Sequence, residues 1–533
     1  MRFITNNQRM PAISKTFCIT AFALVMLACQ VLYYYSVTRM TKIVAIFFVG
    51  VLFICAAYAA LKFFIKREEY EDVITKRVFP CALVIFASLS VFFFPAGSIP
   101  DEPYHFYNSY AYCKSVISPG YDSIRAEDAP LFESGGMLSC EIKQSDWAYV
   151  QEHIFDCAES GEIPIDSLEG FDASKLPSFD LIADINTVLP QQKIPSALGI
   201  GVGLILGLNH VWIFYLGRIF NMLFAALLII AAVRIVPICR NAMMVAALFP
   251  MTLHLLGSYS YDAPIIGFGF LLTALVAKMF YGDGKITVNL IIAVLVTTFL
   301  IAPCKVVYTL IGFSALFVPS RRFGSKRQCA TFKAILVIVS IIAILIPKLT
   351  FLVALGVSTP GQNARGLEVG TFWSLSDILS DPFGSWLLVW RTLECNGAFW
   401  LMNIPGDSLG WFQQNTSLPD FVSIFLLLIF GVACIQSTDD SCIAPVQLRV
   451  VMFVAVFIAA AGVILSMWLG WTFLEDIAIQ GVQGRYFLPL IPMLAISFRS
   501  SLLTCRANLG YAVVISSTTM VAMSMMYIMA VAA

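Results

Sequence analysis

Asp101, Glu102 and His105 lie in the segment SIPDEPYHFYNSYAYC at 98–113, directly after an apolar stretch. A carboxylate here could take a proton from an attacking hydroxyl, and a second carboxylate with the imidazole could hold Mn²⁺ or Mg²⁺. On a helix, Asp101 and His105 would share a face at i and i+4. The alternative is that the two acids only begin a helix, where carboxylates favour the positive end of the dipole. We interpret Asp101 and Glu102 as candidate catalytic residues, and all three as a candidate metal site.

Two cationic side chains are candidates for binding a phosphate. Arg485 in GVQGRYFLP carries a planar guanidinium that suits a phosphate, and Lys305 in APCKVVY could add a second positive charge. Both could instead be anchors that extend to the membrane interface. Asp262 in GSYSYDAP could bind a metal, pair with Lys305 or, as the favoured alternative, cap the following helix.

Further polar residues are candidates for the same site. Arg218 and Asn221 in LGRIFN share a helical face, and an arginine inside a membrane needs a partner. Arg218 could therefore be functional, or it could brace the bundle through an acidic residue. Tyr107 and Glu394 are candidate substrate contacts. His254 belongs to no metal-binding spacing, so we interpret it as a loop or interface histidine.

The composition indicates an integral membrane protein. The 533 residues are 59% hydrophobic and 12% charged, with a mean hydropathy of +0.84. The 33 basic and 33 acidic residues give no net charge, so nucleic acid is not an expected partner. The sequence also lacks a Walker loop and a dinucleotide fingerprint, which argues against ATP-driven transport and NAD chemistry.

Apolar stretches predict an all-α bundle of about thirteen transmembrane helices. A shorter Gly-rich stretch at 194–208 is typical of a re-entrant or interfacial helix. Two long polar segments, 97–193 and 357–419, should lie outside the membrane and contain short amphipathic helices. The predicted spans are near 16–36, 43–65, 78–96, 210–236, 241–260, 263–281, 286–302, 304–320, 334–356, 420–436, 448–470, 485–503 and 510–531.

The basic loops predict the orientation. Lys and Arg collect at 66–77, 234–241 and 320–333, and the predicted spans place these loops on one face, which should be cytoplasmic. The N-terminus falls on that face, and the acidic segment 97–193 falls on the outer one. Four cysteines are expected outside, and the sequence does not choose among their pairings: Cys113, Cys140, Cys157 and Cys395.

Several motifs together resemble a known bacterial family. PDEPYHFY, LGRIFN, SYSYDAP, the turn from Lys305 to Tyr308, ECNGAFW and QGRYFLPLIP occur in the order found in the domain of unknown function 2142 family. The resemblance covers roughly residues 78–505. It divides the chain into an N-terminal transmembrane hairpin and cytoplasmic loop (1–77), a core (78–505) and a last helix (506–533).

That family resembles the GT-C clan of membrane glycosyltransferases. The resemblance implies transfer of a sugar from a polyprenyl phosphate carrier to a glycan or glycoconjugate acceptor on the outer face of the cytoplasmic membrane. It also implies that an acid in the first exterior loop, Asp101 or Glu102, acts as general base or metal ligand. A polymerase or ligase of lipid-linked glycans is the alternative. A lipid or polysaccharide transporter is less favoured, because the acidic residues lie near the surface rather than at the midplane.

Overall fold

Helices form nearly all of the regular structure in the residues that the computed structural model describes. Those residues are 73–94, 99, 102–118, 189–281, 284–355, 372–409, 417–437, 440, 442–499, 502–505 and 509–532. The α-helices are α4 (Phe79–Phe93), α5 (Glu102–Ile117), α10 (Pro190–Ile205), α11 (His210–Ile235), α12 (Arg240–Ala247), α13 (Pro250–Leu256), α14 (Asp262–Phe280), α15 (Val288–Ile301), α16 (Thr309–Phe313), α17 (Lys326–Leu355), α18 (Leu375–Ser380), α19 (Pro382–Asn403), α20 (Asp420–Ala433), α21 (Val446–Trp471), α22 (Ile491–Phe498) and α23 (Gly510–Ala532). A π-helix, η2 (Ile74–Val78), precedes α4, and the 3₁₀ helices are η7 (Val306–Tyr308), η8 (Ser314–Phe317), η9 (Ser320–Arg322) and η11 (Gly484–Leu490). This part of the chain has no strand, so the all-α prediction is confirmed for it.

Five helices in the described part are long and apolar enough to cross a membrane. They match predicted spans and cover Ile74–Phe92, Val211–Ile235, Asp262–Phe280, Lys326–Leu345 and Val446–Trp471. Shorter apolar helices cover several of the other predicted spans. The predicted spans 16–36 and 43–65 lie outside the described residues, so the count of thirteen is not confirmed.

The prediction of one continuous helix is wrong for three segments. Segment 241–260 divides into α12 and α13, because Pro250 begins a new helix and has no N–H for the preceding turn. Segment 485–503 begins as the 3₁₀ helix η11, which contains a proline, and continues as α22 only to Phe498. Segment 304–320 consists of three short helices, η7, α16 and η8.

Glycines let the central helices approach closely. Helix α11 packs against both α10 and α14. A Cβ atom on Gly199 of α10 would lie 2.2 Å from the carbonyl oxygen of Leu216 in α11, and one on Gly217 would lie 1.9 Å from the Tyr259 hydroxyl. Small residues at helix interfaces are typical of membrane bundles. The motif LGRIFN therefore lies at a tight three-way contact.

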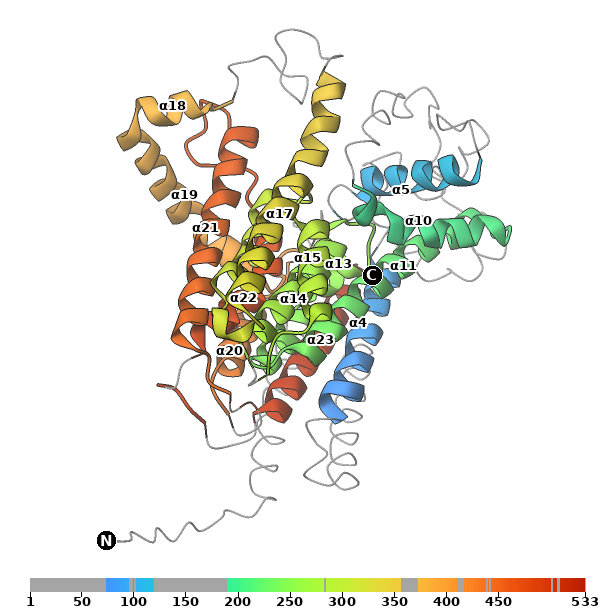
Figure 1. Cartoon of the computed structure of the whole chain (residues 1–533). Helices are drawn as coiled ribbons and strands as arrows, with labels where there is room; N and C mark the ends of the chain where they lie inside the picture. Colours follow the sequence, from blue (N-terminus) through green and yellow to red (C-terminus); the bar gives the residue numbers. More distant parts are fainter. Residues whose placement is uncertain are drawn as a thin grey trace.

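Helices α5 and α10 lie side by side across one end of the bundle, and α18 and α19 lie towards the same end (Figure 1). We call this the α5 end. In the predicted exterior region 357–419, α19 has 22 residues, which is longer than the short helices that we expected. Its exposed side chains include Phe383, Trp386 and Trp390.

The basic segments lie at the opposite end of the bundle. Arg234, at the end of α11, donates to the carbonyl oxygen of Lys76 in η2 at 3.3 Å. Arg322 donates to the carbonyl oxygen of Met279, near the end of α14, at 3.0 Å. Because α11 and α14 pack together and both run away from the α5 end, the described parts of the three basic loops share one face, as predicted.

Candidate functional site

A buried ion pair fixes the start of α5. The Arg218 Nε and Nη2 atoms donate to the two carboxylate oxygens of Glu102 at 2.9 and 2.7 Å, and both side chains are 0% exposed. Arg218 Nη1 also donates to the carbonyl oxygens of Val91 and Phe94 at 2.8 and 2.6 Å. The backbone N–H of Tyr259 donates to Glu102 at 3.1 Å. Arg218 thus braces α4, α5 and α11 through an acidic partner, which is one of the two roles that the sequence left open.

Asn221 holds the turn that precedes α14. Its side-chain amide donates to the carbonyl oxygens of Ser258 and Ser260 at 2.8 and 3.1 Å. The Ser260 hydroxyl in turn accepts a hydrogen bond from the backbone N–H of Asp262 at 3.2 Å. All four residues are buried. LGRIFN and SYSYDAP, about forty residues apart, therefore form one rigid unit that positions the Asp262 carboxylate.

Asp262 lies between two cations. Its carboxylate is 3.5 Å from Arg485 Nε and 3.7 Å from Lys305 Nζ. The Lys305 ammonium also lies 3.8 Å from the centre of the Tyr486 ring. We call Asp262, Lys305 and Arg485 the cation cluster. The contact with Lys305, one of the three roles that the sequence left open, is present, whereas the favoured capping role is wrong, because Asp262 is already inside α14 and Tyr261 is the N-cap residue.

His105 is buried in α5 near this cluster, and Tyr107 is buried in the same helix. The His105 ring packs edge-on against Tyr261, with the ring centres 4.0 Å apart. Burial lowers the pKa of His105 to about 3; the Asp262 carboxylate opposes this shift, and Arg485 and Lys305 support it. The imidazole is therefore neutral at pH 7. Burial also raises the pKa of Tyr107.

The described residues do not fit the predicted metal site well. Both oxygens of Glu102 are occupied by the Arg218 guanidinium, which competes with any divalent cation for the carboxylate. Within the described ranges, no three His, Cys, Asp or Glu side chains cluster as ligands would. Asp101 lies outside the described residues, so its predicted roles stay predictions.

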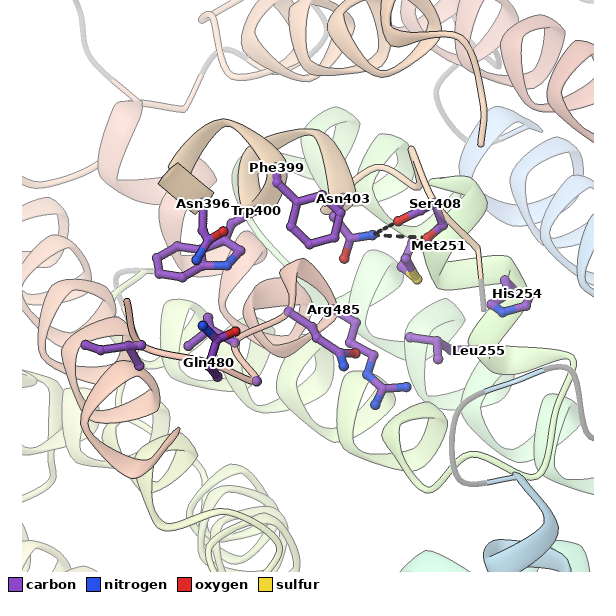
Figure 2. Close-up of a pocket in the computed structure, with 14 residues that line it drawn as sticks. Met251, His254, Leu255, Asn396, Phe399, Trp400, Asn403, Ser408, Gln480 and Arg485 are labelled. Atoms are coloured by element: carbon purple, nitrogen blue, oxygen red, sulfur yellow. Dashed lines mark hydrogen bonds between the residues drawn. The ribbon is translucent and has the colours of Figure 1, made fainter. Parts of the chain in front are cut away.

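A pocket of about 310 Å³ adjoins the cation cluster (Figure 2). Helix α19 forms one wall, α13 a second, and the loop from 479 to 485 forms the third. The pocket and the cluster share Arg485. The lining residues are Met251, His254, Leu255, Asn396, Phe399, Trp400, Asn403, Ser408, Ile479, Gln480, Gly481, Val482, Gln483 and Arg485. The predicted contact Glu394 is exposed on α19 and is not among them.

The sequence analysis missed the polar lining of this pocket. Of its four amides, Asn396 lies in ECNGAFW and Gln483 in GVQGRYFLP, whereas Gln480 and Asn403 lie outside the named motifs. Gly484 lets this segment approach α19 closely, because a Cβ atom on it would lie 2.7 Å from the Trp400 carbonyl oxygen. The sequence analysis selected candidates by their charge, and these amides are neutral.

The predicted exterior cysteines are only partly described. Cys113 is a buried free thiol in α5, and Cys395 is an exposed free thiol in α19. Cys140 and Cys157 lie outside the described residues.

The comparisons with known proteins give one family. A family model described as a predicted membrane protein, DUF2142, matches residues 83–494, which is more than half of the chain. The chain belongs to this family. Neither the curated proteins nor the solved structures gave a match. The DUF2142 match contains the Glu102 and Arg218 pair, the whole cation cluster and every residue that lines the pocket.

Proposed function

We propose that this DUF2142 protein is a GT-C-like membrane glycosyltransferase, built on a bundle of about thirteen transmembrane helices. It takes a sugar from a polyprenyl phosphate carrier and transfers it to a cell-surface glycan or glycoconjugate. The observation that carries the proposal is the cation cluster at the edge of a pocket with neutral polar and aromatic walls. The cations suit a phosphate, and the neutral polar and aromatic walls beside them suit a sugar.

The charges of the cation cluster favour an anionic ligand. The cluster consists of two cations and one carboxylate, so a ligand that reaches it meets both Arg485 and Lys305. The N–O distances of 3.5 and 3.7 Å are longer than those of charge-assisted hydrogen bonds, which are about 2.7–2.9 Å. Asp262 thus holds Arg485 and Lys305 near each other through contacts longer than charge-assisted hydrogen bonds. A phosphate bound here would accept shorter hydrogen bonds from both Arg485 and Lys305.

The proposed reaction is a displacement at the anomeric carbon. The acceptor hydroxyl oxygen bonds to that carbon, the bond from the carbon to the phosphate oxygen breaks, and polyprenyl phosphate leaves with the bonding electrons. Arg485 and Lys305 stabilise the charge that develops on the leaving phosphate. The hydroxyl proton goes to a carboxylate, for which Asp101 and Asp262 are the candidates; such a base contributes about 10²–10⁴-fold to the rate.

The positions of the basic segments support an outward-facing site. Lys and Arg in short loops favour the cytoplasmic side, and the described basic segments lie opposite the α5 end. The α5 end, with the cluster and pocket, would then face outwards from the cytoplasmic membrane. A carrier lipid in the outer leaflet would present its phosphate there.

The proposal is tested by transfer of label from polyprenyl phosphate sugars. The purified protein in nanodiscs would be given each radiolabelled donor and a membrane extract as acceptor, with and without Mn²⁺ or Mg²⁺. We expect a labelled product from the wild type and a loss of at least about 100-fold in the Arg485→Ala variant, as for removal of one donor to a developing oxyanion. The matched control is Arg321→Ala, which removes an exposed arginine at the opposite end.

Two results would contradict the proposal. Wild-type transfer by the Arg485→Ala protein would show that the cation cluster does not bind the donor phosphate. Transfer from lipid-linked oligosaccharides but from no single-sugar donor would assign the protein to the polymerase or ligase class instead.

A further inference from the structure

The pocket beside Arg485 contains a buried histidine whose hydrogen-bonding capacity is unused. His254 is 1% exposed and lines the pocket (Figure 2). Among the described residues, neither of its ring nitrogens has a hydrogen-bond partner. A buried polar group left in this way lowers the stability of the fold. Phe94, whose ring centre is 4.2 Å away and edge-on, fixes the plane of the imidazole. A ligand with hydroxyl groups would satisfy these nitrogens.

The wall at the end of α19 is held in place by its own hydrogen bonds. The Asn403 amide donates to the Ser408 carbonyl and hydroxyl oxygens at 3.1 and 2.8 Å, and its carbonyl oxygen accepts from the backbone N–H of Gly484 at 3.0 Å. These bonds join the end of α19 to the segment that carries Arg485. The wall is therefore formed before any ligand arrives, which reduces the entropy cost of binding.

The pocket lining discriminates by charge. Among the described lining residues, Arg485 is the only charged side chain, and the other polar side chains include amides, one hydroxyl and the imidazole. Among the described lining residues, a sugar carboxylate would meet no cation besides Arg485, and a sugar ammonium would meet no carboxylate. Phe399 and Trp400 supply apolar surface for one face of a ring. The volume of about 310 Å³ lies at the lower end of ligand pockets, which span about 300–1,000 Å³, so it suits a single ring.

We propose that this pocket binds the single, uncharged sugar ring of a glycosyl phosphate, with the phosphate at Arg485 and ring hydroxyls at His254 and Asn396. The inference rests on the proposed function and deepens it, since it names the class of sugar and the residues that select it. The ring nitrogens of His254 accept from one hydroxyl or donate to another, and the side-chain amide of Asn396 does the same from α19.

The experiment measures binding in the absence of transfer. Isothermal titration of the purified full chain in detergent would use four probes: a short-chain isoprenyl phosphate carrying a neutral hexose, the same lipid carrying a uronic acid, the sugarless lipid phosphate, and the methyl glycoside without phosphate. We expect the neutral glycosyl phosphate to bind at least about tenfold more tightly than each of the other three, because one hydrogen bond of about 1.4 kcal/mol corresponds to tenfold.

The variants separate the sugar from the phosphate. His254→Phe and Asn396→Ala should lose the tenfold preference for the sugar but keep the affinity for the sugarless lipid phosphate. Arg485→Ala should weaken both. His254→Phe should unfold at the wild-type temperature or above it, because an apolar ring of similar shape replaces nitrogens that have no partner in the described structure. Asn289→Ala, an exposed change on α15, is the control for Asn396→Ala.

Each contrary outcome identifies what has failed. Equal affinity for the glycosyl and sugarless lipid phosphates would overturn the sugar pocket and leave the phosphate site standing. Tighter binding of the uronic acid would overturn the selection for an uncharged ring. A methyl glycoside that binds as well as the glycosyl phosphate would make the pocket an acceptor site. Absence of binding by every lipid phosphate would reject the proposed function itself.

Discussion

Replacing Glu102 by glutamine should destabilise the fold by about 3–5 kcal/mol. The carboxylate and the Arg218 guanidinium are both 0% exposed and are joined by contacts of 2.9 and 2.7 Å. Glutamine keeps the shape of the side chain but removes its charge. The guanidinium would then stay buried with the carbonyl oxygens of Val91 and Phe94 and without the carboxylate that neutralises it. An uncompensated buried charge accounts for the magnitude.

Thermal unfolding of the purified protein in nanodiscs, followed by tryptophan emission, measures this loss. One kcal/mol corresponds to about 2–4 °C in domains of 150–250 residues, so we expect the Glu102→Gln variant to unfold at least about 5 °C below the wild type. Glu475→Gln, which changes an exposed acid, should unfold with the wild type. An unchanged unfolding temperature for Glu102→Gln would refute the conclusion that the ion pair of Glu102 and Arg218 stabilises the fold.

A double variant separates stability from catalysis. Replacing Glu102 and Arg218 together by methionine and leucine should recover most of the stability, because apolar residues of similar volume often substitute for a buried ion pair without loss. If the stable double variant still transfers sugar, the prediction that Glu102 is the general base is wrong. If it is stable and inactive, a catalytic role for Glu102 gains support.

Two further predictions concern α5 and α11. Stability should fall as the pH decreases from 6.5 towards 3, because burial lowers the pKa of folded His105 to about 3 and the unfolded chain, with a pKa of 6.5, binds the extra proton. Unfolding temperatures measured across this range should depend less on pH in His105→Phe, and an identical pH dependence would contradict the assignment. Gly217→Ala should lower the unfolding temperature by several degrees, because its Cβ would lie 1.9 Å from the Tyr259 hydroxyl. The double variant with Tyr259→Phe should recover part of the loss. A Gly217→Ala protein that unfolds at the wild-type temperature would contradict the close contact.

Hydropathy was enough to predict the class of fold. Long apolar stretches identify spans because the backbone polar groups of a membrane segment must bond within the segment, whatever the rest of the chain does. Five such spans are found in the described structure. The three segments that break, 241–260, 304–320 and 485–503, were predicted as spans from the same property. Hydropathy alone does not register their prolines and short turns, and in these segments the local backbone determines whether the helix is continuous.

The individual charged residues were also visible in the sequence, but their partners were not. Arg218 was expected to need an acidic partner, and the expectation is general because a lone charge inside a membrane is costly. That the partner is Glu102, 116 residues earlier in the chain, depends on how α5 crosses the end of the bundle. The same pairing weakens the metal site that the sequence suggested.

The sequence by itself determined that this is a helical membrane protein, which of its segments carry charge, and the family to which it belongs. Only the tertiary structure decided that Asp262, Lys305 and Arg485 meet, and that His254 faces a pocket of neutral amides. The physical reason is that hydropathy and charge are properties of single residues and short segments, whereas a site is a set of distances between residues that are far apart in the chain. Those distances follow from helix packing, which depends on small residues such as Gly199 and on broken helices such as α12 and α13.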